Sequence, residues 1–143
     1  MITAVRWLAV LLTVTVLVAC GITREAHPNT LANTAWRAFT IGGVAPAAGH
    51  EPTATFKIAD VSGSTGCNDW FASYTFDAAT GKLVLEGIGM SAAACLDDAV
   101  SRTEAAFSTA LTSVNQASID PTGRLVLSGP GGEIVFEVAA VAR

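Results

Sequence analysis

Hydrophobic and polar residues alternate along much of the chain after residue 30, which is the pattern of half-buried β-strands. In residues 54–59, Phe56 and Ile58 fall on one face of such a strand, and Thr55 and Lys57 fall on the other. Stretches rich in glycine, proline and aspartate separate the alternating segments and predict turns between them. Strands are therefore expected at 34–41, 54–59, 70–76, 82–86, 117–120, 124–128 and 133–138, with a short strand at 88–91.

One segment between the strands has the 3.6-residue period of a helix. The pattern predicts a helix that begins between Leu96 and Ser101 and ends near Thr112. Ser101 and Glu104 have the spacing of a capping box, and Asp97-Asp98 suits the positive end of a helix dipole. The order of elements indicates an α+β fold with a mainly antiparallel, curled or barrel-like sheet and one packed α-helix. The apolar stripe of the helix consists of Val100, Thr103, Phe107, Ala110, Leu111 and Val114.

The chain opens with a different pattern, a short and almost purely apolar run. The 13 residues from Trp7 to Ala19 are interrupted only by two threonines, and Arg6 precedes them. A helix needs about 20 apolar residues to cross a bilayer, so a membrane anchor is the weaker interpretation. A positive flank before a short apolar run is typical of a secretory signal peptide, and we expect residues 1–19 to be this leader.

The end of the leader resembles a known cleavage signal. Leu17-Val18-Ala19-Cys20-Gly21 is similar to the lipobox of bacterial lipoproteins. This resemblance implies a lipid on the sulfur of Cys20, cleavage before it, and a mature chain held on the extracytoplasmic side of the cell membrane. Two acyl chains on one cysteine are enough for durable anchoring. Residues 20–30 are then expected to be a lipidated tether between the membrane and a folded domain at 31–143.

The charge balance limits the partners of this domain. All 143 residues together are 51% hydrophobic and 14% charged, with a formal net charge of −4. A disordered chain would not carry so much apolar side chain. Without the leader, which contains Arg6, the net charge becomes about −5. A mildly acidic domain is unsuited to phosphate-rich surfaces, so we expect no nucleic-acid partner.

Two cysteines remain once Cys20 is assigned to the lipid. Cys67 and Cys95 are an even pair in an oxidising compartment, and we predict a disulfide between them. The alternative is a metal site, but the pair lacks CxxC spacing and has no histidine nearby in the sequence. We therefore expect no metal and no cofactor.

The mature part contains a series of motifs in a fixed order. They are the opening Leu31-Ala-Asn-Thr34-Ala-Trp36, the core Gly66-Cys67-Asn68-Asp-Trp-Phe71-Ala-Ser-Tyr74, the second cysteine Cys95, the helix residues Glu104, Phe107 and Leu111, and the closing strands around Leu125-Val-Leu127 and Ile134-Val-Phe136. Over about residues 31–138 this series resembles a META domain of the heat-shock protein HslJ type. The resemblance implies a bacterial envelope protein linked to stress tolerance, secretion or motility, from a family that defines no catalytic residues.

Few polar residues are candidates for a site. His27 lies in the tether and His50 in a loop rich in proline and glycine, and a Ser-His-Asp triad lacks the G-x-S-x-G element. Asn68, beside Trp70 and Tyr74, is the candidate binding surface. Its structural alternative is an Asx turn or a left-handed residue after the cysteine.

The sequence thus predicts a non-enzymatic envelope lipoprotein. We expect it to act in envelope stress or protein quality control by binding a protein whose identity is unknown. The alternative is a barrel module that binds a small molecule or a peptide at its mouth or on an aromatic surface.

Overall fold

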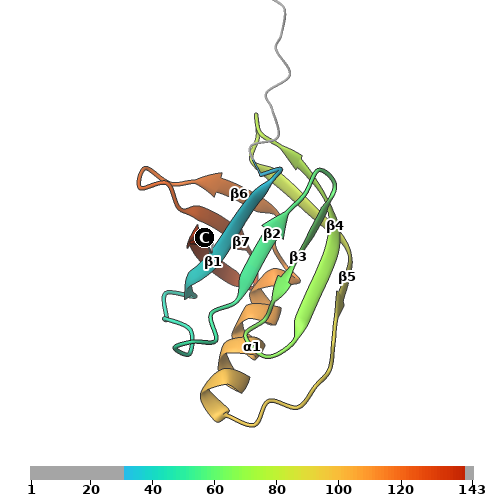
Figure 1. Ribbon diagram of the computed structural model, residues 1–143. Coiled ribbons are helices and arrows are strands. Elements are labelled where there is room, and N and C mark those ends of the chain that lie inside the picture. Colours follow the sequence, from blue (N-terminus) through green and yellow to red (C-terminus); the bar gives the residue numbers. More distant parts are fainter. Residues whose placement is uncertain (1–30, 141–143) are drawn as a thin grey trace, which may run out of the picture.

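The alternating segments pair with one another in chain order and close into a barrel (Figure 1). The computed structural model describes residues 31–140, so the leader at 1–19, Cys20 and the tether at 20–30 lie outside the described residues. Every neighbouring pair of strands is antiparallel, and the last strand pairs with the first. The elements are β1 (Thr34–Ile41), β2 (Thr53–Phe56), β3 (Asp60–Ser64), β4 (Asp69–Asp77), β5 (Lys82–Met90), α1 (Asp98–Leu111), β6 (Gln116–Ile119), β7 (Leu125–Gly129) and β8 (Gly132–Val138).

The expected α+β fold with a barrel-like sheet is confirmed, but two strand predictions are wrong in detail. The strand predicted at 54–59 ends at Phe56, because the amide of Lys57 donates to the carbonyl of Asp60 and closes a tight turn. Ile58 lies in that turn and is 79% exposed, so it does not share the buried face of Phe56. The segments predicted at 82–86 and 88–91 form the single strand β5, whose pairing with β4 shifts register near Gly87.

Strand β3 is absent from the sequence prediction because its sequence hardly alternates. Only Val61 among its five residues is a buried hydrophobic side chain. Gly63 explains how the strand packs: a Cβ added there would lie 1.9 Å from the carbonyl oxygen of Thr53. The strand therefore forms where a glycine permits close approach of two backbones.

Helix α1 has the predicted extent but a different cap. Asp97 is the N-cap, and its carboxylate accepts hydrogen bonds from the amides of Ala99 and Val100. The predicted capping box is wrong, since Ser101 lies inside the helix and Glu104 points elsewhere. The expected apolar stripe is confirmed, and it packs α1 against β8, β1 and β7.

The core is formed by the inward side chains of the strands and by the buried face of α1, which contributes Phe107, Ala110 and Leu111. Phe107 is fully buried, with its ring centroid 5.9 Å from that of Trp70 and 6.4 Å from that of Phe136. Phe56 and Tyr74 make an edge-to-face contact at 5.1 Å. Aromatic contacts of this kind add stability beyond the burial of area, so α1 is fixed to the barrel through its middle. Within residues 31–140, no helix is both long and apolar enough to cross a bilayer.

Candidate functional site

The predicted disulfide joins two loops at the end of the barrel near the start of α1. Cys67 lies in the turn between β3 and β4, and Cys95 lies in the loop between β5 and α1. Their sulfurs are bonded and their Cα atoms are 5.9 Å apart, which confirms the pairing. The bond therefore ties the loop that leads into α1 to the β3–β4 turn.

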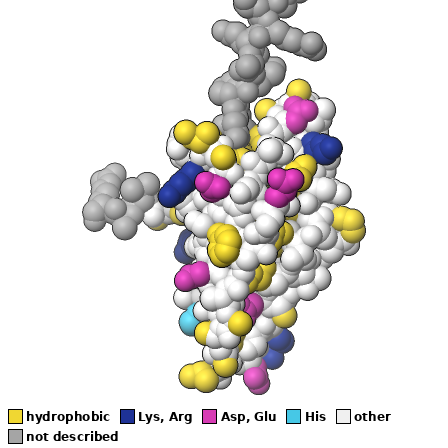
Figure 2. All heavy atoms as spheres, turned by 90° about the vertical axis from the view of Figure 1, so that its right-hand side faces the viewer, with side chains coloured by type: hydrophobic (Ala, Val, Ile, Leu, Met, Phe, Trp, Pro, Cys, Tyr) yellow, Lys and Arg dark blue, Asp and Glu magenta, His cyan; other side chains and the backbone are white. Residues whose placement is uncertain are grey.

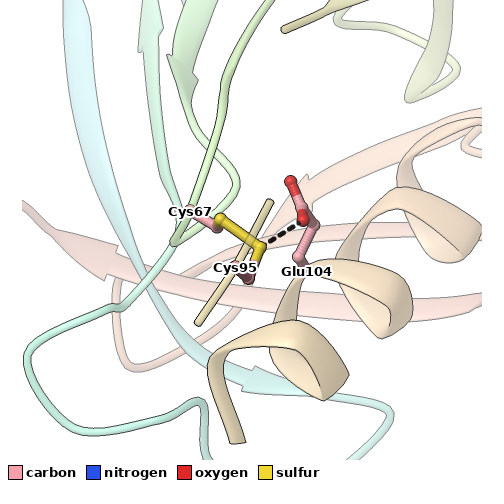
Figure 3. Close-up of side chains that lie close together, drawn as sticks. All are labelled: Cys67, Cys95 and Glu104. Atoms are coloured by element: carbon pink, nitrogen blue, oxygen red, sulfur yellow. Dashed lines mark hydrogen bonds between the residues drawn. A yellow bond between two sulfur atoms is a disulfide. The ribbon is translucent and has the colours of Figure 1, made fainter. Parts of the chain in front are cut away.

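Glu104 reaches from α1 to this bond (Figure 3). Its Oε2 lies 2.8 Å from the sulfur of Cys95. Its Oε1 accepts hydrogen bonds of 2.7 Å from the hydroxyl of Thr65 and of 2.7 Å from the side-chain amide of Asn68. Because a bridged sulfur carries no proton, the Cys95 contact brings a carboxylate oxygen against the disulfide without a donated hydrogen. Sequence spacing had assigned this glutamate to a helix cap, and only the fold shows its partners.

Asn68 lies at the centre of these contacts and is 5% exposed. Its Oδ1 accepts from the hydroxyl of Ser91 at 3.0 Å and from the amide of Ala93 at 2.7 Å, and its Nδ2 donates to the carbonyl of Ala93 at 3.0 Å. The role is structural, but neither predicted form is correct. The bonds reach distant segments and make no Asx turn, and Asn33 is the one non-glycine residue of the described chain with positive φ.

The other two residues of the candidate binding surface face the core. Trp70 is 1% exposed and donates from its indole nitrogen to the carbonyl of Thr53, and Tyr74 is 4% exposed and donates from its hydroxyl to the carbonyl of Lys57. The expectation of an exposed surface at Asn68, Trp70 and Tyr74 is therefore wrong. Alternating positions on β4 point these side chains inward, where their polar atoms satisfy backbone carbonyls.

Ligand atoms of Cys67, Cys95 and Glu104 all lie within 4.8 Å of one another, which is close enough to hold a metal ion. Metals bind the thiolate form of cysteine, however, and these two sulfurs are bonded to each other. In the bridged protein this donor set does not fit a metal. The cluster is a disulfide with an adjoining carboxylate.

Three polar residues that could serve in acid–base chemistry, His50, Asp77 and Asp97, have structural partners. The Nδ1 of His50 lies 3.0 Å from the carbonyl of Gly66 and donates to it. Hydrogen bonds from the Val100 and Ala99 amides lower the pKa of Asp97, and the Thr80 hydroxyl and the Ala79 amide lower that of Asp77. The two aspartates thus act as a helix cap and a turn former.

A groove follows α1, which we call the α1 groove. Its larger part has a volume of about 380 Å³ and lies between the helix and the β1–β2 loop. A second hollow of about 340 Å³ shares Ile41 and Ala106 with it and continues to Gly131. The lining is mostly small and apolar, and Arg102 is its one charged residue. Residues that line the larger part include Ile41, Val44, Pro46, Ala99, Arg102 and Ala106.

The face on the side of β4 and β5 is different (Figure 2). Hydrophobic side chains are dispersed there between acidic and basic ones and do not gather into one area. Single exposed apolar residues are normal on soluble proteins. The α1 groove is thus a more contiguous apolar feature than this face.

Comparison with known proteins identifies the family of this domain. The sequence model of the META domain matches residues 29–141. The chain belongs to the META domain family. Among curated proteins, none is significantly similar to it.

Two solved structures resemble this META domain. The first is titled an NMR structure of a protein from Burkholderia xenovorans, with 23% identity, a TM-score of 0.57, and coverage of 78% of this chain and 85% of the other. The second, also an NMR structure, has 17% identity, a TM-score of 0.63, and coverage of 79% and 95%. At these identities the likeness establishes the shared fold alone.

Proposed function

We propose that this META domain is a non-enzymatic lipoprotein of the cell envelope, held by a lipid on Cys20, that binds a partner protein through the α1 groove. In this proposal it acts in envelope stress or protein quality control. The observation that carries the binding proposal is the α1 groove, whose lining residue Val44 is 70% exposed. Exposed apolar surface that is contiguous and hollowed is typical of recognition sites.

The anchoring part rests on the sequence. The short apolar leader ends in Leu17-Val18-Ala19-Cys20, and the even pair Cys67–Cys95 suits an oxidising compartment. The intact mass of the protein purified from its native envelope tests this part. We expect a chain that begins at Cys20 and carries a lipid mass, and a chain without lipid would refute the anchoring.

The non-enzymatic part is supported by the way polar groups are used. In the described chain, every buried side-chain nitrogen and oxygen has a hydrogen-bond partner. Catalytic and small-molecule sites usually contain polar groups that bond to the ligand instead of to other protein groups. The barrel interior is packed with aromatic and aliphatic side chains, and this packing favours a surface binder over a module with a ligand in the barrel mouth.

A complementation experiment tests the function. A strain that lacks the gene is challenged with agents that damage the envelope, and survival is compared after expression of wild type, Ala106→Arg or Thr75→Arg. Ala106 is exposed in both parts of the α1 groove, whereas Thr75 is exposed on β4, outside it. We expect Thr75→Arg to restore survival and Ala106→Arg to fail at equal protein level. Equal rescue by both variants would refute the role of the groove.

A further inference from the structure

The Cys67–Cys95 disulfide lies within reach of external thiols. Both cysteines are half-buried and line an open hollow of about 250 Å³, together with His50, Leu96 and Asp97. Leu96, next to Cys95, is fully exposed. A disulfide in such a place is accessible to small thiols, so burial alone does not protect it.

A carboxylate lies against the same bond. The Oε2 of Glu104 is 2.8 Å from the Cys95 sulfur, and its Oε1 is fixed by donors from Thr65 and Asn68. Both donors bond to Oε1, so this oxygen accepts two hydrogen bonds while Oε2 lies against the sulfur. Since Asn68 is itself held by Ser91 and Ala93, the carboxylate has little freedom to move away from the sulfur.

Reduction of the bond by a dithiol proceeds in two displacements. A thiolate of the dithiol attacks one cysteine sulfur and forms a mixed disulfide, while the Cys67–Cys95 bond breaks and its electron pair leaves on the other sulfur as a thiolate. That thiolate takes a proton from water. The second thiolate of the reagent then displaces the first cysteine, which leaves two reduced cysteines and an oxidised, cyclic dithiol.

Glu104 opposes both routes of the first displacement. Attack on Cys95 brings an anionic thiolate toward the carboxylate, and like charges repel. Attack on Cys67 expels the Cys95 thiolate beside the same carboxylate, and a thiol of raised basicity is a slow leaving group. We propose that Glu104 is an electrostatic guard that keeps this accessible disulfide closed in the presence of thiols.

The test is the initial rate at which dithiothreitol reduces the oxidised, folded protein, measured by trapping free thiols and mass spectrometry. Glu104→Gln keeps an oxygen for Thr65 and Asn68 but removes the charge, and we expect it to react about tenfold faster. Asp98→Asn removes one charge from the first turn of the same helix, at a residue that does not line the hollow beside the sulfurs. Ser101→Ala removes a neutral hydrogen bond to the carbonyl of Cys95 and leaves the bonds of Glu104 and Asn68 in place. Both controls are expected to stay within about twofold of wild type.

Three results would overturn the proposal. A Glu104→Gln rate within about twofold of wild type would mean that the charge has no effect. Equal acceleration by Ser101→Ala would assign the effect to a loosened loop, and equal acceleration by Asp98→Asn would assign it to the overall charge of the helix and not to Glu104. The salt dependence of the reduction rate of the wild type is a further test, and it needs no variant that could fail to fold. Salt screens repulsion, so reduction of the wild type should speed up several-fold between about 0.01 and 1 M NaCl, and an unchanged rate would count against the guard.

Discussion

Replacing Asn68 with alanine removes a side chain that connects three parts of the molecule. Asn68 lies in the β3–β4 turn, and its amide group contacts the loop after β5 through Ser91 and Ala93 and contacts helix α1 through Glu104. The substitution leaves the amide and the carbonyl of Ala93 without their partner and takes one of two donors from Glu104. The native side chain is 5% exposed, so water replaces these bonds poorly.

The magnitude follows from the four bonds. A neutral hydrogen bond contributes about 1 kcal/mol to stability, and one to a charged group contributes about 1.5–3 kcal/mol. Three neutral bonds and one charged bond give about 4.5–6 kcal/mol in total, which is an upper bound. Ser91 and Ala93 are themselves exposed, and water solvates their freed groups in part. The free energy of unfolding is therefore expected to fall by about 3 kcal/mol.

Urea denaturation of the oxidised protein, followed by circular dichroism, measures this loss. A drop of this size corresponds to a fall in Tm of about 10–20 °C for a domain of this length. Asn115→Ala is the matched control, since Asn115 is exposed and its backbone carbonyl and amide, which the substitution keeps, bond to Leu83 and Ser128. The control should change stability by less than about 0.5 kcal/mol. A loss below about 1 kcal/mol for Asn68→Ala would refute the view that this amide holds the loops together.

Three further results are expected. Phe107→Ala should lower the free energy of unfolding by about 3–5 kcal/mol in the same urea assay, because the ring is fully buried between Trp70 and Phe136, and a loss under about 1 kcal/mol would contradict that packing. Gly63→Ala should destabilise by about 2 kcal/mol or more, because its Cβ would meet the Thr53 carbonyl, and unchanged thermal stability would show that β2 and β3 separate freely. The Val100 and Ala99 amides lower the pKa of Asp97 from 3.8, so the stability that its carboxylate contributes is present above that value and is lost as the pH falls below it. The Tm of Asp97→Asn should therefore fall less than that of wild type between about pH 4 and 2. Identical slopes of Tm against pH would contradict the role of Asp97 as a cap.

Alternation was sufficient to predict most of the barrel. Where a strand has one wet and one buried face, as in β4 with Trp70 and Tyr74 inward, its period appears directly in the sequence. It failed at β3, where contact depends on a glycine and not on a hydrophobic face. It also failed at Ile58, because one hydrogen bond from Lys57 turns the chain before the pattern ends.

The candidate site was less predictable because its contacts join distant positions. The pairing of Cys67 with Cys95 followed from their number and compartment. Glu104 could not be found in this way, since 36 positions separate it from Asn68 and its spacing to Ser101 imitates a helix cap. The α1 groove is lined by a loop, a helix and a turn that are distant in the sequence, so no local pattern predicts this surface.

Site-specific photo-crosslinking in the native envelope tests the central claim most directly. A photoreactive residue replaces Ala106 in the α1 groove or, as the control, Thr75 on the outer face of β4. The account predicts one discrete adduct to the same protein from the position of Ala106, with none from the position of Thr75. It also predicts that a second change, Val44→Lys, abolishes this adduct. Equal adducts from both positions, or no adduct from the groove, would contradict a META domain that binds its partner there.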